Sequence, residues 1–254
     1  MRDQPIRLER EGCVATLTLC CPELRNAVTR EWIDALQTHA DTLHMDESLR
    51  CVVVRSEGPM FCVGADVKAM ASNLDNLPAY IQSLIQPAQA ALLRLASLPV
   101  PIVGLLRGTA AGGGASFALA CDILIAERSA RMVFAYPQLG TTPDLGLSHA
   151  LISRLGSIRA LQLLLLTDTI NMDDAERLGL VQKVIDEADV EDEVKALVLR
   201  LIRLPSTASK SLFMAGRIPE LSTWLDRELN SFLVCSGTEE FRSRVKAFAK
   251  GHRG

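Results

Sequence analysis

The sequence predicts an α/β fold with a helical C-terminal part. Up to about residue 147, short apolar segments with β character alternate with longer segments of helical periodicity. Beyond that point, apolar segments with helical spacing dominate the sequence. Strands that alternate with helices at this spacing are typical of parallel strands joined by helical crossovers. With 48% hydrophobic residues in 254, the chain can bury a large core, which excludes general disorder.

The N-terminal elements follow from alternation and from helix capping. Residues 6–10 and 14–19 alternate around a Glu-Gly pair and predict a β-hairpin. Thr29 is suited to cap a helix that runs to about Met45, with apolar residues at helical spacing. Residues 50–55 then predict a short buried strand.

The remaining elements follow in the same way. Residues 77–96 predict a helix that Pro87 should kink or divide. Strands are predicted at residues 101–106 and 123–126, with a short helix after the glycines between them. In the C-terminal part we expect helices at 148–155, 159–166, 190–203, 221–234 and 239–250, and a strand at 181–185.

Charge and composition exclude several classes of partner. The net charge is −3 and the basic residues are dispersed, which argues against a nucleic-acid module or an anionic membrane surface. No apolar stretch approaches the roughly 20 residues of a membrane span, and no apolar signal segment is visible. Seven cysteines, an odd number without CxxC spacing, predict reduced thiols and a cytoplasmic protein. The four histidines show no zinc-ligand spacing, so we expect no metal.

Two glycine-rich segments each follow a predicted strand and precede a predicted helix. In residues 58–66, Gly64 permits a sharp turn and the Ala65 N–H could point into a cavity. In residues 107–116, three consecutive glycines at a helix start leave free N–H groups in an uncrowded, electropositive place. Either site could stabilise a developing oxyanion. An ordinary loop and close helix packing are the alternatives.

Two polar residues, Ser116 and Asp144, are candidates for catalysis. Ser116 lies one residue away from a G-x-S-x-G pattern, which would make it a hydrolase nucleophile with Asp144 and with His149 or His252, although the spacing is poor. Asp144 lies on a Pro-Gly turn between apolar segments, where burial would raise its pKa and make it a usable base. The alternative for Asp144 is a helix N-cap.

Taken together, several ordered motifs resemble the crotonase family, also called the enoyl-CoA hydratase/isomerase family, over essentially the whole chain. They are residues 19–27 (LCCPELRNA), 61–66 (FCVGAD), 108–114 (GTAAGGG), 121–123 (CDI), 139–144 (LGTTPD) and 175–181 (AERLGLV). The first is similar to the family's N-R-P-x-x-x-N-A segment.

The resemblance implies a spiral of ββα turns over residues 1–195 and a C-terminal helical trimerisation region over residues 196–254. It implies an acyl-CoA thioester substrate, no cofactor apart from the coenzyme A of the substrate, and a homotrimer or a dimer of trimers. The N–H groups of Ala65 and Gly113 would hold the thioester oxygen.

The sequence departs from the family where the hydratases carry two glutamates. Aligned on the glycine triplet, these positions hold Ser116 and Tyr136, and neither is a carboxylate. Asp144 is the carboxylate that remains, in a pattern similar to phenylacetate-pathway epoxide isomerases and Δ3,Δ2-enoyl-CoA isomerases. The sequence therefore predicts an acyl-CoA isomerase with Asp144 as proton shuttle. The alternatives are an enoyl-CoA hydratase that uses Asp144 and water, and an inactive acyl-CoA-binding homologue.

The resemblance also suggests residues that contact the substrate. They are Arg25, Cys62, Gly64, Lys68, Met70, Gly112, Ser116, Phe117, Tyr136, Leu139 and Leu147. A solvated surface role is the alternative for Arg25 and Lys68, and core packing is the alternative for Phe117. We interpret Asp66 as a residue at a helix start and Asp122 as a structural residue beside a buried strand.

Overall fold

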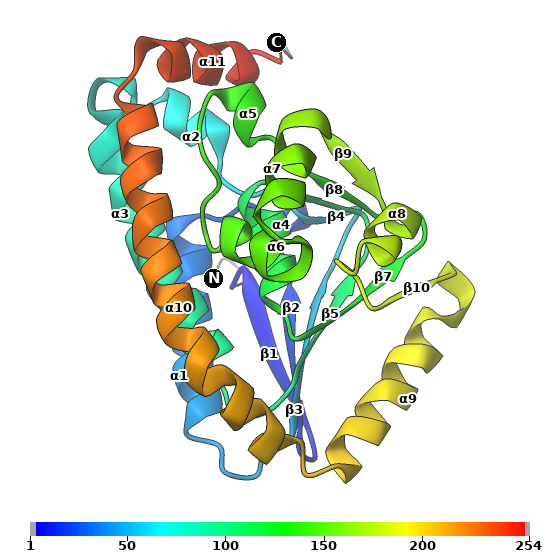
Figure 1. The fold of residues 1–254 in the computed structure, drawn as a ribbon. Helices are drawn as coiled ribbons and strands as arrows, with labels where there is room; N and C mark the ends of the chain where they lie inside the picture. Colours follow the sequence, from blue (N-terminus) through cyan, green and yellow to red (C-terminus); the bar gives the residue numbers. More distant parts are fainter. Residues whose placement is uncertain (1–3, 252–254) are drawn as a thin grey trace.

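The computed structural model describes residues 4–251 and contains two β-sheets with helices packed around them (Figure 1). The strands are β1 (Ile6–Glu11), β2 (Val14–Leu19), β3 (Cys51–Ser56), β4 (Met60–Cys62), β5 (Ile102–Leu106), β6 (Thr109–Ala111), β7 (Ile123–Glu127), β8 (Arg131–Val133), β9 (Thr169–Asn171) and β10 (Lys183–Ile185). The α-helices are α1 (Arg30–His44), α2 (Val67–Ala71), α3 (Leu77–Ala96), α4 (Gly113–Ala120), α5 (Tyr136–Leu139), α6 (Leu147–Leu155), α7 (Ser157–Leu166), α8 (Met172–Arg177), α9 (Val190–Arg203), α10 (Ser206–Ser236) and α11 (Glu239–Ala249).

The larger sheet has the strand order β1-β2-β3-β5-β7-β10, and every pair except the β1–β2 hairpin is parallel. Its central strands β3, β5 and β7 are buried on both faces, whereas the edge strand β1 is largely exposed. Val52 and Val54 of β3 belong to the main core with α1 and α3, whereas Cys51 and Val53 pack in a second cluster with α9. This division follows from the two-residue alternation of a strand.

The smaller sheet has the order β4-β6-β8-β9. Because β4, β6 and β8 are parallel neighbours, their carboxyl ends meet at one edge. The segments that leave this edge contain Ala65, Gly113 and Tyr136. The smaller sheet therefore gathers residues that are up to about 70 positions apart in the chain.

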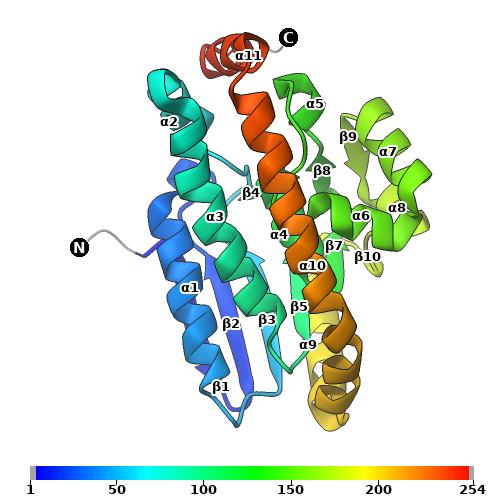
Figure 2. The ribbon, with the colours of Figure 1, turned by 60° about the vertical axis from the view of Figure 1, so that its left-hand side comes forward.

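The C-terminal helices close the structure over the sheets. Helix α10 lies alongside α3 (Figure 2), and the Gln89 side chain donates a 2.7 Å hydrogen bond to the Leu225 carbonyl across their contact. Helix α11 then crosses above α2 and α5. No helix within residues 4–251 combines the length and apolar character needed to cross a bilayer.

The longer strands and helices are observed in the predicted order, with three differences, whereas the short strands β4, β6, β8 and β9 were not predicted. Helix α3 runs through Pro87 without division. Proline removes the hydrogen bond to the carbonyl four residues earlier, and this carbonyl, Ser83 O, instead accepts from Arg30 Nη1 at 3.4 Å. The strand predicted at 181–185 begins only at Lys183.

The third difference is the length of α10, which begins at Ser206 rather than near residue 221. The first half of this helix has no clear apolar stripe in the sequence. It is anchored instead by Lys210, whose ammonium lies 2.7 Å from Asp122 Oδ2 and donates to Val100 O at 2.8 Å. The ion pair between Lys210 and Asp122 therefore stabilises this part of α10, which the local sequence pattern does not predict.

Candidate active site

Two glycine loops meet at the carboxyl edge of the smaller sheet. Gly64 follows β4 with φ = +76°, and a Cβ at this position would lie 2.8 Å from Gly113 N and 2.7 Å from Ala111 O. Only glycine allows this approach, so the loop carrying Ala65 lies directly against the start of α4. Gly112, just before α4, donates its N–H to Val133 O at 3.0 Å and ties α4 to β8.

Both predicted oxyanion donors are available for a ligand. Ala65 is exposed, and its N–H does not donate to another backbone carbonyl of residues 4–251. Gly113 is the first residue of α4, where the backbone N–H has no partner within the helix. The Gly114 backbone lies so close to β4 that a Cβ would be 2.1 Å from Cys62 O. This contact fixes α4, and with it the Gly113 N–H, against β4.

Asp144 faces these donors from the loop between α5 and α6. Its side chain is 7% exposed, and a Cβ placed on Gly113 would lie 3.7 Å from Asp144 Oδ1. Its carboxylate does not cap α6, because Gly146 is the residue that precedes the helix. The N-cap alternative is therefore wrong.

Tyr136 and Ser116 hold Asp144 through hydrogen bonds. The Tyr136 hydroxyl donates to Asp144 Oδ1 at 2.5 Å, and Ser116 Oγ donates to the Asp144 backbone carbonyl at 2.9 Å. The Ser116 and Tyr136 oxygens are themselves 3.1 Å apart. The Ser116 hydroxyl has no hydrogen bond to His149, and His252 lies outside the described residues. The hydrolase alternative thus lacks its nucleophile–base contact.

Burial sets the protonation chemistry of the site. Burial, reinforced by the negative charge of Glu228, raises the pKa of Asp144 to about 7, although the Tyr136 hydrogen bond opposes this shift. The pKa of Tyr136 is raised well above its ordinary value by burial and by Asp144. Asp144 can therefore gain and lose a proton near neutral pH, whereas Tyr136 stays a hydrogen-bond donor.

A mostly apolar cleft opens beside the Ala65 and Gly113 N–H groups. It encloses about 450 Å³ including its mouth, and among residues 4–251 Asp144 is the only ionisable side chain that lines it. Its lining residues are Val28, Ala65, Met70, Ile81, Leu84, Ile85, Ala88, Gly113, Asp144, Leu145 and Phe232. The structure thus brings together Asp144, Ala65, Gly113 and Met70 of the predicted site.

Other predicted contact residues lie elsewhere. Phe117 is buried in the core, where its ring packs edge-on against Trp32 at 5.1 Å between centroids. Leu147 and Leu139 also pack into the core rather than lining the cleft. Cys62 is buried, and its Sγ accepts from Gly64 N at 3.4 Å, so it shapes the loop from within.

The charged residues of the motifs are also placed. Arg25 and Lys68 are both exposed. Asp66 caps α2 by accepting from the N–H groups of Lys68 and Ala69. Asp122 accepts from Ile102 N at 2.8 Å and pairs with Lys210, so both aspartates have the structural roles expected of them.

Two groups of residues at the site are not apparent from the sequence motifs. Helix α3 lines the cleft with Ile81, Leu84, Ile85 and Ala88. Their helical spacing shows that they are apolar and on one face, but it does not show whether that face lines a cleft or packs into the core. Glu228 of α10 binds the loop that carries Asp144. A signal for Glu228 existed, because it occupies an apolar position in the spacing of Leu221, Leu225 and Phe232.

Metal-binding geometry is not seen in the described part of the chain. Within residues 4–251, no group of three or more His, Cys, Asp or Glu side chains is placed to hold a metal ion. All seven cysteines are free thiols.

The chain is similar in sequence to proteins of one known family. The family model for enoyl-CoA hydratase/isomerase matches residues 9–251. The chain is 31% identical over 247 residues to the 1,2-epoxyphenylacetyl-CoA isomerase of Escherichia coli (strain K12), covering 94% of this chain and 92% of that protein. It is 28% identical over 254 residues to the crotonyl-CoA hydratase of Syntrophomonas wolfei, covering 98% and 96%.

A solved structure supports the fold. The enoyl-CoA hydratase from Bacillus halodurans superposes with a TM-score of 0.90 at 23% identity, covering 96% of this chain and 99% of that chain. This likeness confirms the predicted α/β architecture with its C-terminal helical region.

Proposed function

Because the chain belongs to the enoyl-CoA hydratase/isomerase family, we propose that it is an acyl-CoA isomerase in which Asp144 moves a proton along the acyl chain. One observation carries the proposal. In the described part of the chain, Asp144 is the only ionisable side chain that lines the cleft, and it lies beside the N–H groups of Ala65 and Gly113.

The reaction proceeds through an enolate. The Asp144 carboxylate takes a proton from the α carbon of a 3-enoyl thioester, and the electron pair of that C–H bond delocalises onto the thioester oxygen. The Ala65 and Gly113 N–H groups stabilise this oxygen, as two donors do in other oxyanion holes. The protonated Asp144 then returns the proton to the γ carbon, and the double bond moves from the β,γ to the α,β position.

The residues around Asp144 favour isomerisation over hydration. Hydration of a double bond needs a group that activates water and a group that delivers a proton. Ser116 and Tyr136 are buried and hydrogen bonded to Asp144 and to each other, and neither ionises near neutral pH. A single carboxylate suffices for a 1,3-proton shift, because the proton it removes is the proton it returns.

The cleft indicates the chemistry of the acyl group. Its walls from α3, α10 and Met70 are apolar, which suits a hydrocarbon chain or an aromatic ring rather than a charged acyl group. A ring-epoxide thioester is a second substrate to test, since the relative in Escherichia coli is named as an epoxide isomerase. Coenzyme A is part of the substrate, so the proposed reaction needs no separate cofactor.

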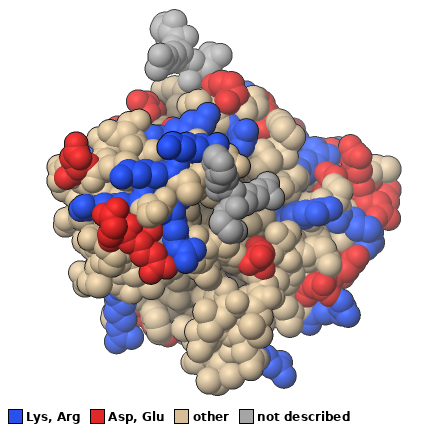
Figure 3. Space-filling view, turned by 90° about the horizontal axis from the view of Figure 1, so that it is seen from above, with Lys and Arg blue, Asp and Glu red and all other residues tan. Residues whose placement is uncertain are grey.

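The coenzyme has three phosphate groups that need basic partners. The face seen from the α11 end carries several Lys and Arg side chains among acidic ones (Figure 3). Exposed Lys68 and Arg25 are the candidates that the motifs provide. We expect their contribution to be modest, because exposed ion pairs are screened by water and salt.

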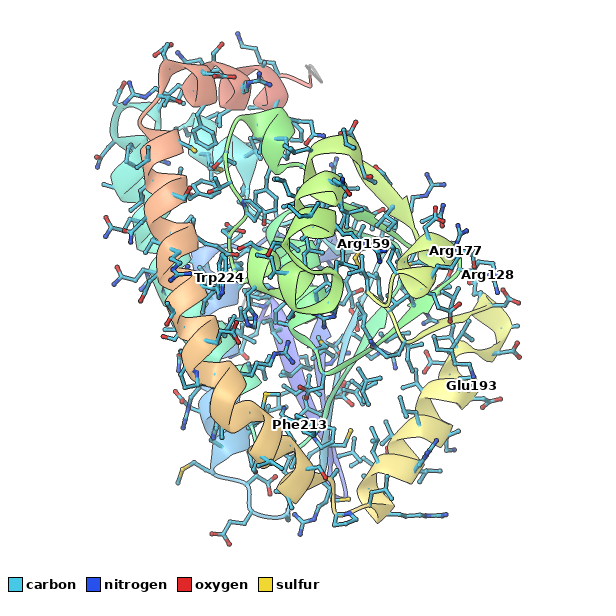
Figure 4. The ribbon with its side chains drawn as sticks, in the orientation of Figure 1. Arg128, Arg159, Arg177, Glu193, Phe213 and Trp224 are labelled. Atoms are coloured by element: carbon cyan, nitrogen blue, oxygen red, sulfur yellow. The ribbon has the colours of Figure 1, made fainter. Side chains whose placement is uncertain are left out.

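We propose that the protein acts as a homotrimer or a dimer of trimers. Helix α7 exposes Ile158, Leu161, Leu165 and Leu166. Helix α10 exposes Phe213 near its start (Figure 4). Apolar surface of this kind is typical of a protein interface. Sedimentation equilibrium measures the mass directly. Free thiols at all seven cysteines favour the reducing cytoplasm as its location.

A paired turnover assay tests the proposed activity. Purified protein and its Asp144→Asn variant are given a 3-enoyl-CoA, followed for conjugated product, and a 2-enoyl-CoA, followed for hydration. We expect turnover of the 3-enoyl substrate and a loss of about 10²-fold or more in kcat for the variant. Asp66→Asn is the matched control, because asparagine caps a helix as well as aspartate does.

The other outcomes are equally informative. Hydration as the main reaction would replace isomerisation as the function. Binding of acyl-CoA by calorimetry, without turnover of either substrate or of a ring-epoxide thioester, would indicate a binding protein instead of an enzyme. Full activity of the Asp144→Asn variant would show that Asp144 is not the proton shuttle.

A further inference from the structure

Glu228 is a buried acid on α10, far from the motifs of the active site in sequence. It is 5% exposed and lies among the apolar residues with which α10 packs into the core. Burial of a carboxylate is costly unless hydrogen bonds compensate it. The partners of Glu228 therefore show what it stabilises.

The Glu228 carboxylate binds the start of α6. Gly146 N donates to Oε2 at 2.6 Å, Ser148 N donates to Oε1 at 2.8 Å, and the Ser148 hydroxyl also donates to Oε1. The residue that precedes α6 is Gly146, which has no side chain to cap the helix. Glu228 thus supplies from another helix the negative charge and acceptors that a helix N-terminus requires.

The segment held by Glu228 is strained and adjoins Asp144. Leu145 has φ = +50°, an uncommon conformation for a residue with a side chain, and Gly146 has φ = +83°. Such a backbone persists only where its surroundings hold it. Ser116 Oγ binds the Asp144 carbonyl on one side of Leu145, and Glu228 binds Gly146 and Ser148 on the other.

We propose that Glu228 is a positioning residue for Asp144, and that its carboxylate fixes the 144–148 segment so that Asp144 faces the Ala65 and Gly113 N–H groups. The inference rests on the proposed function of Asp144. It makes α10 a part of the active-site support, with Glu228 acting through the backbone rather than on substrate.

The charge of Glu228 has a second effect that distinguishes this role from simple packing. Within residues 4–251, the titratable side chains that act on Asp144 are Tyr136 from α5 and Glu228 from α10. The Glu228 anion raises the pKa of Asp144, whereas the Tyr136 hydrogen bond lowers it. Removal of the Glu228 charge must therefore move the acid limb of the activity profile to lower pH.

The test compares two changes at one position in the full-length protein. Glu228→Gln keeps the shape but removes the charge and turns an amide NH₂ towards an N–H donor. We expect kcat to fall about tenfold with KM within a few-fold, because displaced catalytic groups lose rate before binding, and the acid limb to move to lower pH. Glu228→Asp keeps the charge but shortens the reach, so kcat should fall while the acid limb stays in place. Asp226→Asn, an exposed change on the same helix, should alter neither quantity.

The results separate the inference from the proposed function. If Asp144→Asn abolishes turnover but Glu228→Gln keeps wild-type kcat and an unmoved acid limb, the positioning role is overturned and the function stands. If Asp144→Asn is fully active, the proposed function fails whatever Glu228→Gln does. Should Glu228→Gln not fold, Ser148→Ala carries the test, because it deletes the hydroxyl bond to Glu228 and keeps the charge. A lowered kcat with unchanged KM supports the role, and an unchanged kcat overturns it.

Discussion

The Tyr136 hydroxyl donates a 2.5 Å hydrogen bond to Asp144 Oδ1 in a part of the protein where both side chains are buried. Burial favours the protonated carboxyl group, whereas a donated hydrogen bond favours the carboxylate. Burial is the larger effect, and the pKa of Asp144 settles at about 7. This balance keeps Asp144 able to accept and to return a proton at neutral pH.

Tyr136→Phe should shift the activity profile to higher pH. The substitution removes the hydrogen bond that favours the Asp144 carboxylate, so the pKa of Asp144 rises and less of the base is ionised at pH 6. We expect kcat/KM at pH 6 to fall about tenfold for each unit of the rise, with a smaller loss at pH 9. The pH profile of kcat/KM measures this. Tyr80→Phe, at the only other tyrosine, should leave the profile unchanged, and a profile of Tyr136→Phe that matches wild type would contradict the prediction.

Asp144→Asn should stabilise the protein at alkaline pH while it removes activity. The folded-state pKa of about 7 lies above the ordinary value of 3.8, so the folded protein binds more protons between these values. Stability of the wild type therefore falls as pH rises from about 4 to about 7. The variant has no carboxylate whose charged form burial would destabilise. We therefore expect its free energy of unfolding to exceed that of the wild type by on the order of 2–4 kcal/mol at pH 8, with a smaller difference towards pH 4. Urea unfolding at both pH values checks this, and a variant that is less stable at pH 8 would contradict it.

Gly64→Ala should damage catalysis more than stability. An added Cβ would meet Ala111 O and Gly113 N at under 3 Å, so the two loops that carry the proposed oxyanion donors, the Ala65 and Gly113 N–H groups, must move apart. We expect kcat/KM to fall about 10²-fold or more, the loss caused by removal of one oxyanion donor elsewhere. Gly179→Ala is the matched control, because Gly179 has a similar φ of +73° and open space around it. Gly179→Ala should lose about 1–2 kcal/mol of stability from backbone strain alone, and Gly64→Ala should lose more because its Cβ also meets backbone atoms. Equal activity in both variants would refute the effect on the loops.

Lys210→Met should destabilise the protein without changing its substrate affinity. Lys210 is buried and pairs with the mostly buried Asp122, and loss of the ammonium leaves the Asp122 carboxylate without its ionic partner. Breaking one side of such a pair costs about 3–5 kcal/mol. Thermal unfolding should show a lowered Tm, while KM for the acyl-CoA stays unchanged. Lys195→Met, on the exposed side of α9, controls for the loss of a lysine.

Several elements could be predicted because their signals are local. The hairpin of β1 and β2 follows from alternation, and α1 begins after Thr29, whose Oγ1 accepts from Trp32 N at 3.2 Å as the cap pattern indicates. The three-residue strands of the smaller sheet gave no such signal, since a period cannot be read from three residues. The division of α3 expected at Pro87 was wrong for a related reason. The donor that replaces the lost hydrogen bond to Ser83 O is Arg30, which lies far away in sequence.

The sequence by itself determined the α/β class, the order of the longer elements and the two glycine loops. It also showed that Asp144 is a carboxylate, whereas the two positions at which the family hydratases carry glutamates hold Ser116 and Tyr136. These properties depend on residue type and near-neighbour spacing. Only the tertiary structure decided that Ala65, Gly113 and Asp144 share one cleft, that Phe117 belongs to the core, and that Glu228 holds the loop beside Asp144. Parallel strand pairing and helix packing bring these groups together across large separations in the chain, and burial then sets their pKa values, so neither effect is visible in local sequence.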